Sequence, residues 1–169
     1  MRRLLLIGEY ENLMVDEKGR LTIPAEVRKS IVPERDGDGF YVVLGLNGRP
    51  WLYPEQVYEE MVFQQGDEIS PGLEQLDFAH ANFALAHRVS IDSQGRASNL
   101  EKTLRRTRTG REVTLIGAGN HLEIWNKADW DKRRDDELVP QIREVAIRAK
   151  NARQQGRVTP PPPPINGNG

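Results

Sequence analysis

The stretch Asp16-Glu17-Lys18-Gly19-Arg20-Leu21-Thr22-Ile23-Pro24 decides the fold, because a degraded copy, Asp92-Ser93-Gln94-Gly95-Arg96-Ala97-Ser98-Asn99-Leu100, returns later in the chain. The spacing is constant, since 92 minus 16 and 96 minus 20 both give 76. A repeated Asp-x-x-Gly-Arg indicates two copies of one supersecondary unit, each too small to bury a core of its own. We therefore expect the two copies to build one barrel.

The first copy has the pattern of a hairpin loop followed by a short helix. Apolar and polar residues alternate on both sides of the loop, as they do in half-buried strands. Asp16 can accept hydrogen bonds from the backbone two residues on, and Gly19 supplies the positive φ of a type I turn followed by a bulge. Pro24 suits the first position of a helix, where its missing N–H costs nothing. This unit places Lys18 and Arg20 at an exposed tip, where two cations favour an anionic partner more than the fold.

Charge alone leaves two interpretations open. The formal net charge of the 169 residues is -1, yet the segment from Arg96 to Arg111 holds six cations and the single acid Glu101. A solvated surface and an anion-binding surface fit this segment equally well. The cations around the first loop are diluted by acids, so their role depends on where the fold places them.

Composition argues against an enzyme, a metal centre and a bound cofactor. The absence of cysteine excludes disulfides and thiolate metal sites, and the three histidines are scattered. We find neither a glycine-rich phosphate loop nor a grouping of serine, histidine and acid. The spacing of Asp77 and His80 resembles that of carboxylate-bundle ligands, but nothing completes a coordination shell. The apolar run after Arg2 breaks at Gly8, so we expect a soluble, intracellular protein without a membrane segment.

The pattern beyond the loops also repeats. A β-rich run, a turn, a second run and a helix-like opening occur in each half, and Tyr53 matches Trp125 at an offset of 72. After Trp130 the chain becomes densely charged, with an apolar stripe that starts at Leu138 and suits either its own barrel or a neighbouring subunit. The predicted boundaries are 1–66 for the first repeat, 67–87 for a linker and connecting helix, 88–130 for the second repeat, 131–156 for a C-terminal charged amphipathic helix and 157–169 for a disordered Pro-rich tail.

These motifs together resemble the MraZ family, which are bacterial proteins with two tandem AbrB-type swapped-hairpin repeats. The resemblance rests on Asp16-x-Lys-Gly-Arg-x-x-Ile-Pro-x-x-x-Arg28, on Asp92-x-x-Gly-Arg96, and on the strand ends Leu-Tyr-Pro and Leu-Glu-Ile-Trp, and it covers roughly residues 1 to 135. It implies a mainly β fold with short helices (α+β), in which two β-α-β repeats form one pseudo-twofold barrel, and a C-terminal helix follows.

The resemblance also implies a function. The expected protein is a cytoplasmic, nucleoid-associated transcriptional regulator of the division and cell-wall gene cluster. It binds direct repeats in promoter DNA as a ring-like homo-oligomer, with no membrane partner and no small-molecule substrate. The alternative is an antitoxin of the same barrel type whose segment from Leu138 onward wraps a toxin.

Carried over by motif, the implied DNA-binding residues are Lys18, Gly19, Arg20, Arg28 and Arg96. The second half departs from the family pattern, with Gln94 in place of the loop lysine, Asn99-Leu100 in place of Ile-Pro, and Leu104-Arg105 one position late. Arg96 is therefore a weaker candidate than Arg20. A buried Arg20, or one held by a neighbouring carboxylate, would count against this interface.

Overall fold

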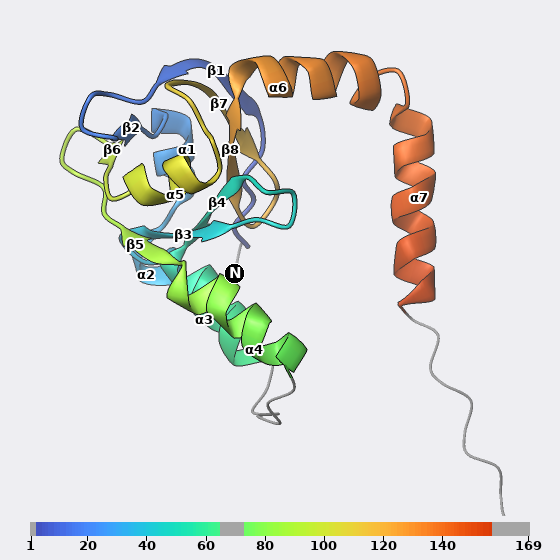
Figure 1. Ribbon diagram of the computed structural model, residues 1–169, viewed down its shortest axis with the longest axis horizontal. Coiled ribbons are helices and arrows are strands. Elements are labelled where there is room, and N and C mark those ends of the chain that lie inside the picture. Colours follow the sequence, from blue (N-terminus) through green and yellow to red (C-terminus); the bar gives the residue numbers. More distant parts are fainter. Residues whose placement is uncertain (1–2, 65–72, 157–169) are drawn as a thin grey trace, which may run out of the picture. The chain divides into compact units, whose positions relative to one another are not determined.

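The computed structural model describes residues 3–64 and 73–156. It divides into two compact units, residues 1–130 and 131–169 (Figure 1). Residues 67–72 of the expected linker and connecting helix, and the expected Pro-rich tail over 157–169, lie outside the described residues.

The first unit combines antiparallel sheets with short helices, which confirms the predicted α+β class. A six-stranded sheet has the order β1 (Glu9–Met14), β7 (Glu112–Gly117), β8 (Leu122–Asn126), β4 (Pro50–Pro54), β3 (Phe40–Leu44), β5 (His87–Val89). A two-stranded sheet joins β2 (Leu21–Thr22) to β6 (Arg96–Ala97). All of these strand pairs are antiparallel.

The strand order is symmetric between the two halves of this unit. Exchanging β1 with β5, β7 with β3 and β8 with β4 reproduces the same sheet. The first strand of each half pairs with the hairpin of the other, because β1 lies against β7 and β5 lies against β3. At the centre of the symmetry, β4 pairs with β8 and Leu21 pairs with Ala97. Neither half therefore completes a sheet without the other.

Short helices follow the strands, as the sequence pattern predicts. They are α1 (Ala25–Ser30), α2 (Pro33–Asp36), α3 (Glu55–Gln64), α4 (Leu73–Ala79), η1 (His80–Ala84, a π-helical turn), α5 (Glu101–Arg106) and α6 (Lys127–Lys132). Pro24 occupies the N-cap position of α1, one residue before the expected first helical position. Glu26 lies in the first turn and Lys29 in the last, which suits the helix dipole at both ends.

Both halves contribute to one apolar core. Leu21, Ile23 and Val27 of the first half are at most 2% exposed, and their counterparts Ala97, Leu100 and Leu104 are at most 5% exposed. These six side chains belong to the same cluster of contacting residues. Burial of apolar area of this kind is the main favourable contribution to folding, so the two halves stabilise one another.

The counterparts also reveal one extra residue in the second half. Leu21 and Ala97 differ by 76 positions, whereas the buried pair Ile23 and Leu100 differs by 77. Asn99 lies between them with a left-handed φ of 66°. Asparagine tolerates this conformation better than most residues, so Asn99 accommodates the insertion and delays the helix by one position.

The second unit is helical and is described by itself. It contains η2 (Arg133–Leu138, a π-helical segment) and α7 (Ile142–Gln155). The expected single helix over 131–156 is interrupted between η2 and α7, where Pro140 cannot donate a backbone hydrogen bond. Within the apolar stripe, Leu138 and Val145 are half-buried, while Ile142 is 65% exposed. Over the described residues, the structure contains no helix of the length and hydropathy needed to cross a membrane.

Candidate nucleic-acid interface

One carboxylate organises the loop between β1 and β2. Asp16 Oδ1 accepts hydrogen bonds from the backbone N–H of Lys18 and of Arg20, both at 2.9 Å, and Oδ2 accepts one from Arg20 Nε at 2.7 Å. Gly19 has a φ of +72° and donates its N–H to the Asp16 carbonyl at 3.0 Å. An aspartate and a glycine three residues apart thus close the turn, as the sequence predicts.

The loop between β5 and β6 has the same geometry despite its altered sequence. Asp92 Oδ1 accepts from the N–H of Gln94 and of Arg96 at 2.9 Å, and Oδ2 accepts from Arg96 Nε at 2.7 Å. Gly95 has a φ of +79°. Only the aspartate, the glycine and the arginine are shared by the two loops, so these three residues specify the turn. Gln94 changes the charge of the second loop and leaves its backbone unchanged.

The carboxylates are held in their charged form. The pKa of Asp16 is lowered chiefly by the backbone hydrogen bond from Arg20, and further by the Arg20 side chain and the Lys18 N–H. The pKa of Asp92 is lowered in the same way, with Arg96 N–H as the main cause. Each loop therefore contains a fixed ion pair at neutral pH.

Arg20 is less accessible than predicted. Lys18 is exposed at the tip, but the Arg20 side chain is only 25% exposed and Asp16 binds its Nε. The carboxylate contact that counts against the loop as an interface is therefore present. It occupies one edge of the guanidinium, and among the described residues no other side-chain hydrogen bond of Arg20 exists. The two terminal nitrogens keep their donors, and the ion pair fixes the plane in which they lie.

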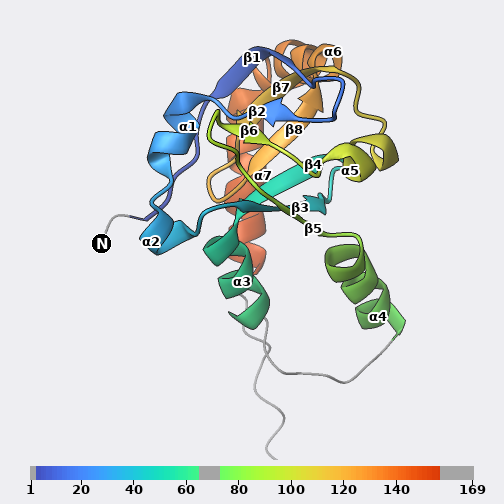
Figure 2. The same ribbon diagram turned by 90° about the vertical axis from the view of Figure 1, so that its left-hand side faces the viewer.

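Each loop contacts a helix of the opposite half. A Cβ placed on Gly19 would lie 3.2 Å from Glu101 Cβ, so the first loop contacts α5 of the second half. A Cβ on Gly95 would lie 2.6 Å from Arg28 Cζ, so the second loop contacts α1 of the first half. Figure 2 shows α1 and α5 on opposite sides of the β2–β6 pair. The predicted residues thus form two groups: Lys18, Gly19 and Arg20 in one loop, and Arg96 with Arg28 at the other.

Sequence reasoning missed the contribution of α5 to the first loop. Lys102, Arg105 and Arg106 are exposed on this helix. The cationic segment was visible in the sequence, but its association with the loop of the opposite half arises from the tertiary fold. No local signal carries that information.

Comparison with known proteins gives the family. A family model described as "MraZ protein, putative antitoxin-like" matches residues 82–158. A protein named transcriptional regulator MraZ from Heliobacterium modesticaldum is 29% identical over 150 residues, covering 84% of this chain and 94% of its own. One of the same name from Pediococcus pentosaceus is 30% identical over 128 residues, covering 76% and 85%. The chain belongs to the MraZ family.

The family match places the second loop and α5 inside the matched residues, since both lie between 82 and 158. A further relative of the same name, from Clostridium tetani, is 27% identical over 148 residues and aligns over 85% of this chain and 100% of its own. Alignments of this length include most of both halves. The resemblance inferred from the two loops is thereby confirmed at the level of the family.

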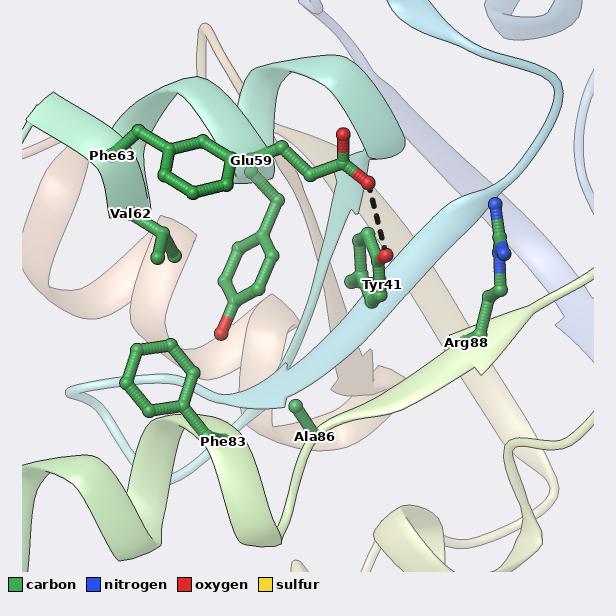
Figure 3. Close-up of a pocket in the computed structure, with 8 residues that line it drawn as sticks. Tyr41, Glu59, Val62, Phe63, Phe83, Ala86 and Arg88 are labelled. Carbon is green, nitrogen blue, oxygen red and sulfur yellow. Dashed lines mark hydrogen bonds between the residues drawn. The ribbon is translucent and has the colours of Figure 1, made fainter.

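A separate cavity lies away from the loops. It has a volume of about 270 Å³ between α3, η1 and the β3–β5 edge, and its lining includes Tyr41, Tyr58, Phe63, Phe83 and Arg88. Figure 3 shows the two phenylalanines on facing helices, and the Tyr41 hydroxyl donates to Glu59 Oε1 at 3.1 Å. Four of its eight lining residues are aromatic, and the lining contains no nucleophile paired with a base. In the described part of the chain, Asp77 and His80 belong to no group of three or more metal-binding side chains.

Proposed function

We propose that this chain is a sequence-specific DNA-binding transcriptional regulator that performs no chemistry. The observation that carries the proposal is the pair of superimposable loops, each presenting an arginine fixed by its own aspartate. The relatives' shared name, transcriptional regulator, supports it. On this view the protein acts in the cytoplasm, at the nucleoid.

The loop mechanism uses the part of Arg20 that Asp16 leaves accessible. The two terminal nitrogens of the guanidinium form a planar pair of donors that matches O6 and N7 of guanine in the major groove. Asp16 lowers the net charge of the loop, which weakens long-range attraction to DNA. In return it removes rotamer freedom from Arg20 before binding, so less conformational entropy is lost on contact. Lys18, exposed at the tip, contacts a phosphate.

The architecture proposed for this function is a pseudo-twofold barrel of AbrB-type swapped hairpins. The support is the exchange of first strands between halves, in which β1 pairs with β7 and β5 with β3. The repeats are residues 1–66 and 88–130, joined by a linker and connecting helix over 67–87. Each repeat lends a strand to the hairpin of the other.

Assembly supplies the affinity that one loop lacks. We assign the protein to a ring-like homo-oligomer that binds direct repeats in the promoter of the division and cell-wall gene cluster. A ring presents the same loop at fixed spacing, so the second and later contacts form at a high effective concentration. Weak individual contacts then yield tight and specific binding.

The decisive experiment is a binding titration on the DNA upstream of the chain's own gene cluster, with the oligomer mass measured on the same sample. We expect tight binding to this DNA and weak binding to a scrambled duplex, with the same oligomer mass of the protein in both titrations. Arg20→Ala should abolish the preference and leave the mass intact, whereas Arg143→Ala on α7 is the matched control. Sequence-specific affinity that persists in the Arg20 variant would discard the loop mechanism.

A second candidate is an antitoxin. It is favoured by the exposed Ile142 on α7 and by the antitoxin-like description of the matching family model. The geometry of the loops does not favour it. In this case the segment from Leu138 onward would bind a toxin. Affinity capture from cells distinguishes the two: a small ribonuclease supports the antitoxin, and self-association alone supports the ring.

A further inference from the structure

Helix α5 presents a concentrated cationic surface beside the first loop. Its six residues hold the cations Lys102, Arg105 and Arg106 and the single acid Glu101, and Arg108 lies two residues after its end. All four cations are exposed. Thr103 at 0% and Leu104 at 5% exposure anchor the opposite face in the core, so the charged face has one fixed direction.

Ion pairs do not account for these charges. Five other arginines of the first unit, Arg20, Arg35, Arg49, Arg88 and Arg96, each bind a carboxylate, while Arg28 and Arg111 donate Nε to backbone carbonyls. In contrast, the cations of α5 and Arg108 form no ion pair with any residue that the structure describes. The helix dipole accounts for cations in the last turn, where Arg105 and Arg106 lie. The same dipole disfavours the positive charge of Lys102, which is the second residue of the helix.

The position of α5 joins it to the first loop. Gly19 lies against Glu101, and a Cβ there would approach Glu101 Cβ to 3.2 Å. Helix α5 also lies near β5, because the positive charges of Arg106 and Lys102 influence His87 at the start of that strand. The pKa of His87 is lowered, first by burial and then by these two positive charges. The exposed cations of α5 therefore lie on a helix that contacts the first loop through Glu101 and whose charges act on His87 at the start of β5.

The mirror-related surface is weaker. Helix α1 has two cations and one acid in six residues. Arg28 donates Nε to the Ile23 carbonyl at 3.0 Å and lies on Gly95, so it is tied to the second loop. That loop has Gln94 where the first has Lys18. The symmetric scaffold thus carries an asymmetric charge distribution.

We propose that α5 is the phosphate-binding part of the DNA interface, and that the interface is built from both repeats. Arg20 of the first loop contacts base edges, while Lys102 and Arg105 of the second half contact the phosphates that flank those bases. The first loop and α5 together form the surface that binds the DNA duplex. This inference rests on the proposed function, since it assigns a second set of contacts to the same DNA.

The test compares Lys102→Gln/Arg105→Gln with Lys150→Gln/Arg153→Gln, a control pair that removes the same charge from exposed positions of α7. Full-length proteins are titrated with the upstream DNA and with a scrambled duplex at several salt concentrations, alongside oligomer mass and thermal melting. For each protomer that contacts the DNA, loss of two phosphate contacts reduces the magnitude of the slope of log K against log salt by about 1.8, which is about 60-fold in affinity at 0.1 M salt. We expect this loss on both duplexes, so that the ratio between them is unchanged, and no comparable loss in the control.

A charge-preserving variant separates binding from folding. Lys102→Arg/Arg105→Lys should keep the wild-type slope, because each position retains one positive charge. Equal salt slopes in the glutamine variant and the α7 control overturn the role of α5 while the proposed function stands. So does loss of binding in the charge-preserving variant. Wild-type protein that does not distinguish the upstream DNA from the scrambled duplex overturns the proposed function itself, and this inference with it.

Discussion

At the scale of single residues, Asp16 determines both the shape and the chemistry of the first loop. Its role in the turn could be predicted from the sequence, because aspartate hydrogen-bonds the backbone two residues on and glycine supplies the positive φ. Its hold on Arg20 could not be predicted. A side chain on a hairpin loop can extend into solvent or fold back, and the choice depends on contacts that no spacing rule contains.

Asp16→Asn should keep the conformation of the loop and remove its ion pair with Arg20. The amide oxygen still accepts from the N–H of Lys18 and Arg20, so the turn persists, but the charged partner of Arg20 Nε is lost. The loop gains positive charge and Arg20 gains freedom. We expect tighter binding to scrambled DNA and a smaller preference for the upstream DNA, measured by titration at fixed salt. Asp92→Asn is the matched control, and an unchanged preference in Asp16→Asn would contradict the clamping role.

The same two carboxylates predict a pH dependence of stability. Their pKa values are lowered in the folded protein from an ordinary 3.8, with backbone hydrogen bonds as the main cause. The stability that they contribute is therefore full above pH 3.8 and is lost as the pH falls through the folded pKa values. Thermal melting between pH 6 and pH 3 should show a smaller decrease in Asp16→Asn/Asp92→Asn than in wild type. An equal decrease would mean that other acids carry the effect.

At the scale of elements, Asn99 shows that the sequence reveals an insertion in the second half but not how the backbone accommodates it. The departure from Ile-Pro and the late Leu104-Arg105 were visible in the sequence. The cause is structural: one residue with a φ of 66° absorbs the insertion, and its Nδ2 donates to the Arg88 carbonyl at 2.8 Å. The crosswise contact of α5 with the first loop was likewise invisible, because it joins residues of opposite halves.

Asn99→Val should destabilise the first unit by about 1–2 kcal/mol or more, because a left-handed conformation costs that much for ordinary residues and a β-branched side chain tolerates it poorly. Asn99→Gly is the control: it removes the hydrogen bond to Arg88 and keeps the backbone relaxed. Denaturant unfolding measures both. A valine variant as stable as the glycine variant would show that the loop adopts another backbone at no cost.

At the scale of the whole first unit, the constant offset between the loops predicted that two copies share a core, and the structure gives the physical reason. Each half supplies a first strand to the sheet of the other and eight buried side chains to one cluster. The repeat could be recognised from the sequence because the turn residues are fixed by backbone geometry. The exchange of strands was expected only from the resemblance to swapped-hairpin repeats, because both pairings present the same residues to the core and the residue pattern does not distinguish them.

This interleaving predicts that neither half is stable alone. A fragment of residues 1–64 would leave β1 without β7 and would expose Leu21, Ile23 and Val27, which the second half buries. What stays paired in this fragment is the β3–β4 hairpin beside three helices, and an isolated two-stranded hairpin is marginal in water at best. We expect this fragment and a fragment of residues 73–130 to be unfolded separately, with no cooperative thermal transition by circular dichroism. Mixing them should restore a single transition, because each then regains its partner strands; a cooperative transition in either fragment alone would show that a half is an independent domain.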